Sequence, residues 1–117
     1  TIIRFAGLFG PGRHPGNWFK NGKIIPQPNG FVNMIHQEDC INIIHEIIDQ
    51  NCWNTTFNAS SNDQPTRKEC YINARNSLNF EMPIFEENSQ LKYKIISSKK
   101  LQEDLNYQFI HDNLLEI

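Results

Sequence analysis

The sequence predicts a mixed fold of the α/β or α+β class, because strand-like and helix-like segments alternate along its 117 residues. Three observations support this prediction. β-branched and aromatic residues cluster at the N-terminus and again after residue 54, isoleucines recur with helical spacing from residue 41, and a helix-capping motif stands at 66–69. The chain contains no internal repeat and no low-complexity tract. Its length suits one small domain with a modest hydrophobic core.

The N-terminal third is predicted to hold two strands separated by a long irregular loop. Residues 1–9 have the β-branched and aromatic content of a buried strand. Residues 10–30 contain five of the six glycines and four of the six prolines, so they should form an extended connection. A loop of this length is uncommon inside a compact domain and is often functional. Residues 31–36, "FVNMIH", have the pattern of a second, short strand.

A helix is predicted for residues 36–51, "HQEDCINIIHEIIDQN". Isoleucines recur within it at intervals of three and four residues, which predicts one apolar face turned toward the core. That face consists of Ile41, Ile44, Ile47 and Ile48. Glu38 and Asp39 fall in the first turn, where carboxylates favour the positive end of the helix dipole.

A strand at 55–60, "TTFNAS", and a second helix are predicted next. Thr66 and Glu69 have the T-x-x-E spacing of a capping box, so a helix should follow over about 67–79. Its apolar stripe is formed by Tyr71, Ala74 and Leu78.

The last third should contain short elements. A turn and a short strand are expected over "MPIFEE", and another strand over 93–96. Ser97 and Ser98 then mark the start of a short helix that carries Leu101 and Leu105. Residues 109–117, "FIHDNLLEI", have the pattern of a last partial helix.

Composition excludes several classes of protein. The chain has 11 basic and 13 acidic residues and a net charge of −2, so neither nucleic acid nor an anionic membrane is expected as a partner. No apolar run approaches the roughly 18 residues of a membrane span, and no leader pattern is present, so a soluble cytoplasmic protein is expected. Three cysteines without a C-x-x-C pair, at Cys40, Cys52 and Cys70, predict reduced buried thiols. The start at Thr1, within a strand pattern, suggests a fragment of a longer protein.

The glycines in "RFAGLFGPGRHPG" raise the question of a phosphate-binding loop. Gly7, Gly10 and Gly12 have the spacing G-x-x-G-x-G, but a dinucleotide fingerprint must run directly into a helix. Prolines follow here instead, and no helical pattern begins before about residue 38. The Gly-Lys-Ser/Thr of a Walker loop is absent as well. The segment is therefore interpreted as a turn leaving a strand.

Three motifs in order resemble a known family. "IIRFAGLFGPGRHPG", "FVNMIHQEDC" and "TFNASSNDQPTRKE" are similar to the C-terminal part of extended short-chain dehydrogenase/reductases, the NAD-dependent epimerase/dehydratase family. The resemblance covers essentially the whole chain. It implies an α/β fold in which 1–117 is the C-terminal, substrate-binding portion of a Rossmann-type enzyme, with 1–9 as a late Rossmann strand and 10–117 mostly the small substrate lobe.

The resemblance also implies a cofactor, NAD or NADP, and a small-molecule substrate, for which a nucleotide sugar is one candidate. The residues that it places at the nicotinamide end of the cofactor are Ala6, Gly7 and Leu8. The residues that it places near the substrate are Arg13, His14, Asn33 and His36. Gly7 stands where many sugar-nucleotide epimerases have Asn, and no Arg precedes His36 within a few positions, so the substrate assignment stays open. His36 and Asp39 also have a structural reading, as caps at the start of a helix.

The catalytic pair of that family is absent from this chain. Its members use Tyr-x-x-x-Lys, whereas the residue four positions after Tyr71 is Arg75, after Tyr93 is Ser97, and after Tyr107 is His111. No catalytic residue is therefore assigned, and the chain alone is expected to be inactive. The favoured hypothesis is the substrate-side portion of an NAD(P)-dependent epimerase/dehydratase-like oxidoreductase.

Two alternatives stay in view. The chain could be a small, non-catalytic α/β binding or interaction module derived from that family. A metal-dependent hydrolase has little support, because the four histidines lack ligand spacing such as H-E-x-x-H, and no metal ligand is assigned. A strand at 1–9 without neighbours on both sides would expose its edges, so self-association into a homo-oligomer is also expected.

Overall fold

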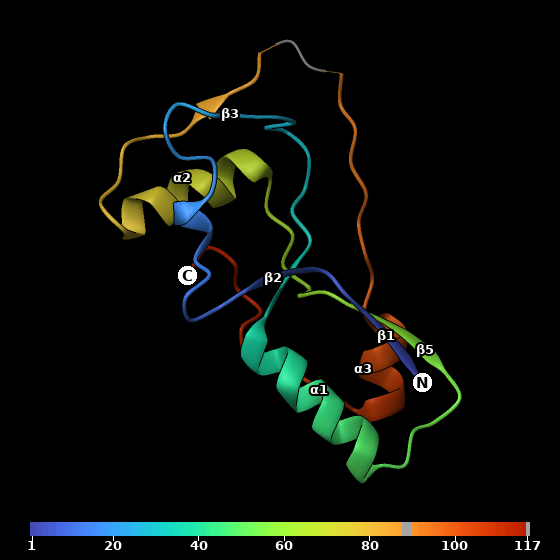
Figure 1. Ribbon diagram of the computed structural model, residues 1–117. Helices are drawn as coiled ribbons and strands as arrows, with labels where there is room; N and C mark the ends of the chain where they lie inside the picture. The colour runs from blue at the N-terminus through green and yellow to red at the C-terminus, as the bar shows by residue number, and fades with distance from the viewer. Residues whose placement is uncertain (88–89, 117) are drawn as a thin grey trace.

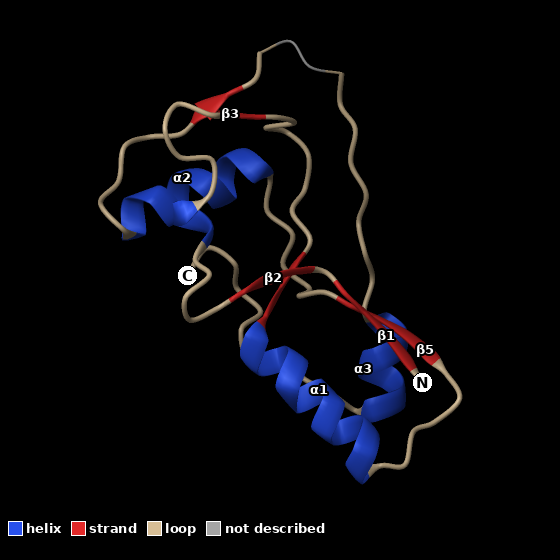
Figure 2. Ribbon diagram, in the orientation of Figure 1, coloured by secondary structure: helices blue, strands red, loops and turns tan. Residues whose placement is uncertain are grey.

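The computed structural model describes residues 1–87 and 90–116, and it confirms the mixed α/β class. The helices are α1 (Gln37–Asp49), α2 (Arg67–Ser77) and α3 (Lys99–Leu105), and the short 3-10 helix η1 covers Pro15–Asn17. The strands are β1 (Ile2–Phe5), β2 (Gly7–Phe9), β3 (Ile24–Ile25), β4 (Met34–His36), β5 (Thr56–Ala59) and β6 (Ile84–Phe85). Figure 1 and Figure 2 show two groups of elements: β1, β5, α1 and α3 form one, α2, β3 and η1 form the other, and β2 lies between them.

The expected strand over 1–9 is an extended run that changes its partner in the middle. β1 pairs in parallel with β5, from Ile2 opposite Thr56 to Phe5 opposite Ala59. β2 pairs in parallel with β4, from Gly7 opposite Met34 to Phe9 opposite His36. The exchange occurs at Ala6, whose N–H donates to the carbonyl of Ala59, whereas the N–H of Gly7 donates to the carbonyl of Asn33.

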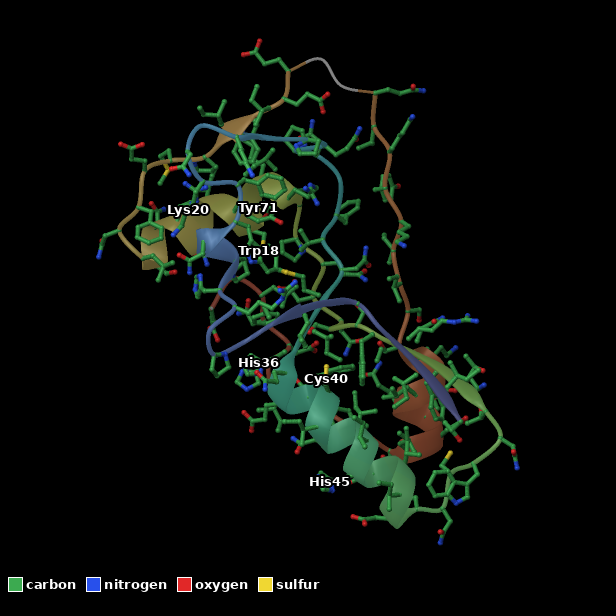
Figure 3. All side chains as sticks on the ribbon, viewed as in Figure 1. Trp18, Lys20, His36, Cys40, His45 and Tyr71 are labelled. Carbon is green, nitrogen blue, oxygen red and sulfur yellow. The ribbon has the colours of Figure 1, made fainter. Side chains whose placement is uncertain are left out.

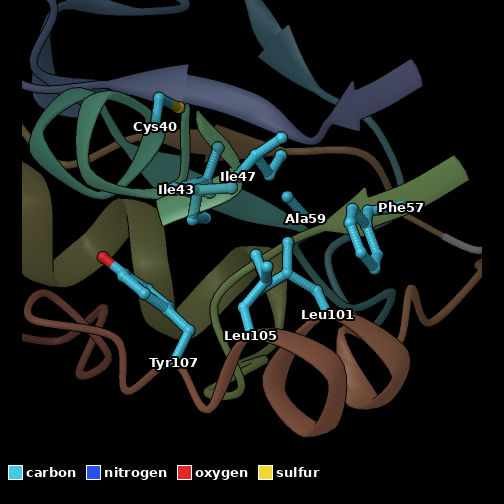
Figure 4. Packing of buried hydrophobic residues seen from close by; sticks show 9 residues of the cluster. Cys40, Ile43, Ile47, Phe57, Ala59, Leu101, Leu105 and Tyr107 are labelled. Atoms are coloured by element: carbon cyan, nitrogen blue, oxygen red, sulfur yellow. The ribbon is translucent and has the colours of Figure 1, made fainter. Parts of the chain in front are cut away.

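The main core lies between α1, β5 and α3, as Figure 4 shows. Each of these three elements contributes two apolar side chains that are buried almost completely: Ile43 and Ile47, Phe57 and Ala59, Leu101 and Leu105. Burying a side chain of the size of leucine stabilises a fold by about 1.5–3 kcal/mol. This cluster therefore fixes the crossover helix α1 and the C-terminal helix α3 against the β1–β5 pair.

The predicted apolar face of α1 is wrong at three of its four positions, because only Ile47 is buried. Ile41, Ile44 and Ile48 are 47%, 42% and 52% exposed, while Cys40, Ile43 and Ile47 face the core together with Asp39. Both sets of positions recur at intervals of three and four residues, so the spacing alone does not distinguish them. The buried carboxylate of Asp39 lies on the inward face, where residues 107–111 supply its hydrogen-bond donors.

Asp39 is fully buried and ties the start of α1 to the C-terminal segment. Its Oδ1 accepts hydrogen bonds from the Tyr107 hydroxyl and from the Ile110 N–H at 2.8 Å, and its Oδ2 accepts one from the His111 N–H at 3.0 Å. A buried carboxylate is tolerated only when such donors replace water. The role of Asp39 is thus structural, but its donors come from residues 107–111 rather than from its own helix.

The second half of the chain follows the prediction in part. The capping box is present, with the Glu69 N–H donating to Thr66 Oγ1 at 3.2 Å. α3 begins after Ser98, whose hydroxyl bonds the N–H and carbonyl of Ser60 instead of capping the helix. Two predictions are wrong: the described residues form no strand over 93–96 and no helix over 109–116. Ile117 lies outside the described residues.

The cysteines carry no disulfide, and Cys40 and Cys70 are buried while Cys52 is half-buried. Burial raises the pKa of the Cys40 thiol to about 11 and that of Cys70 to about 12, so both stay protonated near neutral pH. No helix in the described part of the chain is long and apolar enough to cross a membrane.

Replacing Asp39 should destabilise the fold, because the change leaves buried donors without a charged acceptor. We expect Asp39→Asn to lower the free energy of unfolding by about 2–3 kcal/mol. Urea unfolding followed by circular dichroism measures this difference. Asp49→Asn, on the exposed end of the same helix, is the matched control and should change little. Equal stability of the two variants would contradict the role of Asp39.

The exposed isoleucines of α1 should make the 117-residue chain self-associate. Ile44 and Ile48 adjoin Trp53, which is 52% exposed, and together these side chains line a shallow apolar hollow. Contiguous exposed apolar surface favours association. We expect light scattering to detect species larger than a monomer and Ile48→Glu to shift the population toward the monomer. A concentration-independent monomer for the unmodified chain would contradict this expectation.

Candidate functional site

A cleft of about 720 Å³ lies where the N-terminal run changes partners. Phe5, Ala6 and Gly7 contribute to its lining at the end of β1 and the start of β2, and Asn33 and Met34 contribute from the adjacent strand. In open α/β sheets, ligands bind at the carboxyl ends of parallel strands, where neighbouring connections diverge. Ala6 directly follows the carboxyl end of β1, so the cleft has the position of a ligand site.

Aromatic side chains form much of the remaining wall. Trp18 and Tyr71 lie with ring centres 6.3 Å apart, and both are labelled in the upper group of Figure 3. Phe31 and Tyr93 meet edge to face at 5.0 Å. Burial raises the pKa of the Tyr71 phenol, so its hydroxyl stays protonated near neutral pH. These rings offer flat apolar surfaces on which a planar or ring-shaped ligand can stack.

Arg75 holds the long loop that brings Trp18 to the cleft. Its guanidinium donates to the carbonyls of Trp18 at 2.8 Å, Phe19 at 2.7 Å and Glu81 at 3.1 Å. Phe19 has a positive φ of 56°, a conformation that costs free energy for a bulky residue and needs such support. Arg75 itself is only 6% exposed, so these three hydrogen bonds are shielded from water. They explain how a glycine- and proline-rich loop is ordered without regular structure.

The charged residues that line the cleft are all basic. They are Arg67, Lys92 and Lys94, and no aspartate or glutamate is among the described residues that line it. Arg67 lies over the rings of Tyr71 and Phe19, and its Nε donates to the Pro26 carbonyl at 2.8 Å. The sequence does not predict that the two lysines lie at the cleft, because nothing in "LKYKII" indicates which residues this segment contacts.

Three of the residues predicted for the site line the cleft: Ala6, Gly7 and Asn33. A side chain at Gly7 would have little room, since an added Cβ would come within 3.2 Å of the Asn33 carbonyl oxygen. Both ends of the Asn33 side-chain amide are engaged: it donates to the Lys94 carbonyl and accepts from the Ile96 N–H and from Gln64. It therefore organises the cleft wall in this structure.

The other four predicted residues lie outside the cleft lining. Arg13 donates from Nε to the Leu8 carbonyl at 2.8 Å and lies over the Trp18 ring, so it joins the end of the N-terminal run to the loop that carries Trp18. His14 caps η1, accepting from the Gly16 N–H at 3.0 Å. His36 caps α1, accepting from the Glu38 N–H at 2.9 Å. Direct roles for these four residues stay predictions.

His36 also belongs to a small polar cluster at the start of α1. Its ring stacks on that of His111 at 3.6 Å, and His111 Nε2 lies 2.9 Å from Glu38 Oε2. These three side chains have ligand atoms within 4.8 Å of one another, as a metal site requires. Two nearly parallel stacked rings, however, direct their nitrogen lone pairs side by side rather than toward one point, and His36 Nδ1 already accepts a hydrogen bond. The cluster is better suited to joining residue 111 to α1.

Comparison with solved structures defines the class of the fold. The chain superposes on an NAD-dependent epimerase/dehydratase-type protein of Methylobacillus flagellatus with a TM-score of 0.75 and 21% identity, covering 99% of this chain and 44% of that one. For UDP-N-acetylglucosamine 4-epimerase of Bacillus cereus the TM-score is 0.72 with 18% identity, covering 97% of this chain and 41% of that one. The fold is thus that of the C-terminal part of Rossmann-type epimerases/dehydratases, which confirms the expected resemblance at the level of the fold.

Among curated proteins, the chain is 33% identical to Protein YeeZ of Escherichia coli K12 over 109 residues. That match covers 92% of this chain, but the chain spans only about 39% of the length of YeeZ. No protein-family model matches the chain. Several of the similar solved structures were determined in complex with NAD.

The position of His36 should make stability depend on pH. Burial and then the charge of His111 lower the pKa of His36 below 6.5, against the smaller opposing effects of Asp39 and Glu38. The unfolded chain therefore binds a proton more readily than the folded chain just below that pH, and stability should fall as the solution is acidified through this range.

We expect His36→Asn to reduce this loss, because asparagine also accepts the hydrogen bond at a helix start but does not titrate. Unfolding measured at about pH 7.5 and pH 5.5 tests it. His45→Asn, exposed on the same helix, is the control and should keep the full dependence. Identical pH profiles for the two variants would overturn the assignment to His36.

Proposed function

We propose that this chain forms the substrate-side portion of an NAD(P)-dependent epimerase/dehydratase-like oxidoreductase. The observation that carries the proposal is the cleft at the change of strand partner, which has Ala6 and Gly7 at one side and a basic, aromatic wall at the other. The fold of the chain and its likeness to proteins that bind NAD support this reading. Membership of the family by descent is part of the proposal.

The cofactor would meet only the edge of this chain. Ala6 and the exposed Gly7 line the cleft at the carboxyl end of β1, with their N–H groups engaged by the carbonyls of Ala59 and Asn33, and Gly7 places no side chain there. These features fit the nicotinamide end of NAD or NADP, which supplies hydride transfer when bound. The chain's own contribution is to bind and orient the substrate and to restrict water in the cleft.

The proposed division of the chain needs one adjustment. The sequence suggested 1–9 as the Rossmann strand and 10–117 as mostly the substrate lobe. β5 pairs with β1, and α1 and α3 pack on that pair, so we assign these elements to the sheet side as well. The substrate lobe then consists of the loop from residue 10 to residue 33 together with α2, β6 and the segment up to about residue 96.

The proposal predicts cofactor binding by the complete protein encoded by the reading frame that contains this chain. NAD or NADP should bind with a Kd below about 1 mM and raise the melting temperature. Gly7→Val should weaken this binding, since its branched side chain would meet the Asn33 carbonyl and Met34. The melting temperature of the variant without cofactor shows whether it still folds.

Absence of any NAD or NADP binding by the complete, folded protein would contradict the proposal. In that case the alternative, a non-catalytic binding or interaction module derived from this family, becomes the better reading. Titration calorimetry distinguishes the two results, and a comparison of NAD with NADP also identifies the preferred cofactor.

A further inference from the structure

One wall of the cleft is an extended segment, residues 90–96, that is held by side chains instead of by a neighbouring strand. We call it the strap; in Figure 1 it is the orange trace that runs down one side of the molecule to α3. It is not part of any strand, and no backbone–backbone hydrogen bond joins it to the rest of the described chain.

Three side-chain amides replace the missing strand. Gln27 donates to the Gln90 carbonyl and accepts from the Lys92 N–H, both at 2.8 Å. Asn33 donates to the Lys94 carbonyl and accepts from the Ile96 N–H, also at 2.8 Å. Gln64 donates to the Ile96 carbonyl and to Asn33 Oδ1, both at 2.9 Å. Gln27 and Asn33 thus each present a donor and an acceptor, as a backbone peptide of a paired strand would, whereas Gln64 only donates.

The bonded residues of the strap are 90, 92, 94 and 96, which is every second residue. In an extended chain, backbone groups two residues apart face the same edge and their side chains share one face. A slip by one residue would turn each side chain to the opposite face. Gln27 and Asn33 therefore fix the register that places Lys92 and Lys94 on a common face of the strap; both lysines line the cleft, and so does Tyr93 between them.

These lysines have no acidic partner among the described residues. Neither forms an ion pair within the described residues, and no described acidic side chain lines the cleft that they share with Arg67. Cations gathered around a hollow with aromatic walls create a positive potential that an anion relieves. The ammonium group of lysine binds phosphoryl oxygens as a compact point charge.

We propose that the strap is the anion-binding wall of the cleft, where Lys92 and Lys94 contact the phosphoryl group of a ligand and Gln27 and Asn33 act as positioning residues that set the register of the lysines. The proposal rests on the cleft being the substrate site. Asn33 then acts indirectly, by holding the backbone of Lys94 in place. The strap binds the ligand although it forms no regular secondary structure.

The test is binding of inorganic pyrophosphate to the complete protein in the presence of saturating NAD, so that the probe does not compete for the cofactor site. Calorimetry at constant ionic strength gives the Kd. Lys94→Gln and Lys92→Gln should each weaken binding by about tenfold, as the loss of one charge-assisted contact implies. Lys68→Gln is the control: this lysine is exposed and lies on α2 outside the cleft lining, so its variant should bind like the unmodified protein.

A double-mutant cycle tests the positioning role. Asn33→Leu removes the amide with little change in volume and should weaken pyrophosphate binding by a similar factor in the unmodified protein. In the Lys94→Gln background it should have almost no further effect, because Asn33 acts through that lysine. A merely structural role would weaken binding equally in both backgrounds, and melting temperatures identify variants that fail to fold.

Three results would overturn the proposal: no pyrophosphate binding by the unmodified protein, unchanged binding in both lysine variants, or equal effects of Asn33→Leu in both backgrounds. The proposed function is judged separately by NAD binding. Loss of pyrophosphate binding with NAD binding intact counts only against the strap. Lysine-dependent pyrophosphate binding without any NAD binding counts only against the oxidoreductase assignment.

Discussion

The exchange of partners at Ala6 and Gly7 is the constraint on which the rest of the structure depends. The N-terminal run pairs with β5 before this point and with β4 after it. These two partner strands therefore diverge, and the cleft opens where they separate. The main core secures one side, through α1 and α3, and the loop held by Arg75 secures the other. The site is therefore a consequence of strand pairing, not of any single motif.

Segments far apart in the sequence are joined by polar side chains at the places where regular structure ends. Asp39 accepts hydrogen bonds from residues 107–111, and the side chains of Gln27 and Asn33 accept hydrogen bonds from the backbone of the strap. Such contacts give direction that apolar packing lacks, because a hydrogen bond weakens steeply when the donor, hydrogen and acceptor are far from linear. They explain how a chain with short strands and long loops keeps a defined cleft wall.

Local patterns predicted what depends on neighbours in the sequence. The capping box at Thr66, the helices α1, α2 and α3, and the turn nature of the glycine loop all follow from spacing, and the resemblance of three ordered motifs gave the fold. What could not be predicted depends on distant partners: Asp39 lies on the buried face of α1 because residues 107–111 supply its donors, and residues 93–96 have a strand pattern but form no strand, since side-chain amides replace the ladder. For the same reason the sequence did not point to Lys92 and Lys94, whereas the resemblance named Ala6 and Gly7, which also line the cleft.

The central claim is that the cleft borders the reacting end of a nicotinamide cofactor. A crystal structure of the complete protein with NAD tests it most directly. We expect the nicotinamide ring to contact the backbone at Ala6 and Gly7 and to face the cleft lined by Trp18 and Lys94. A nicotinamide bound away from these residues, or a cleft filled by side chains from the rest of the protein, would contradict it.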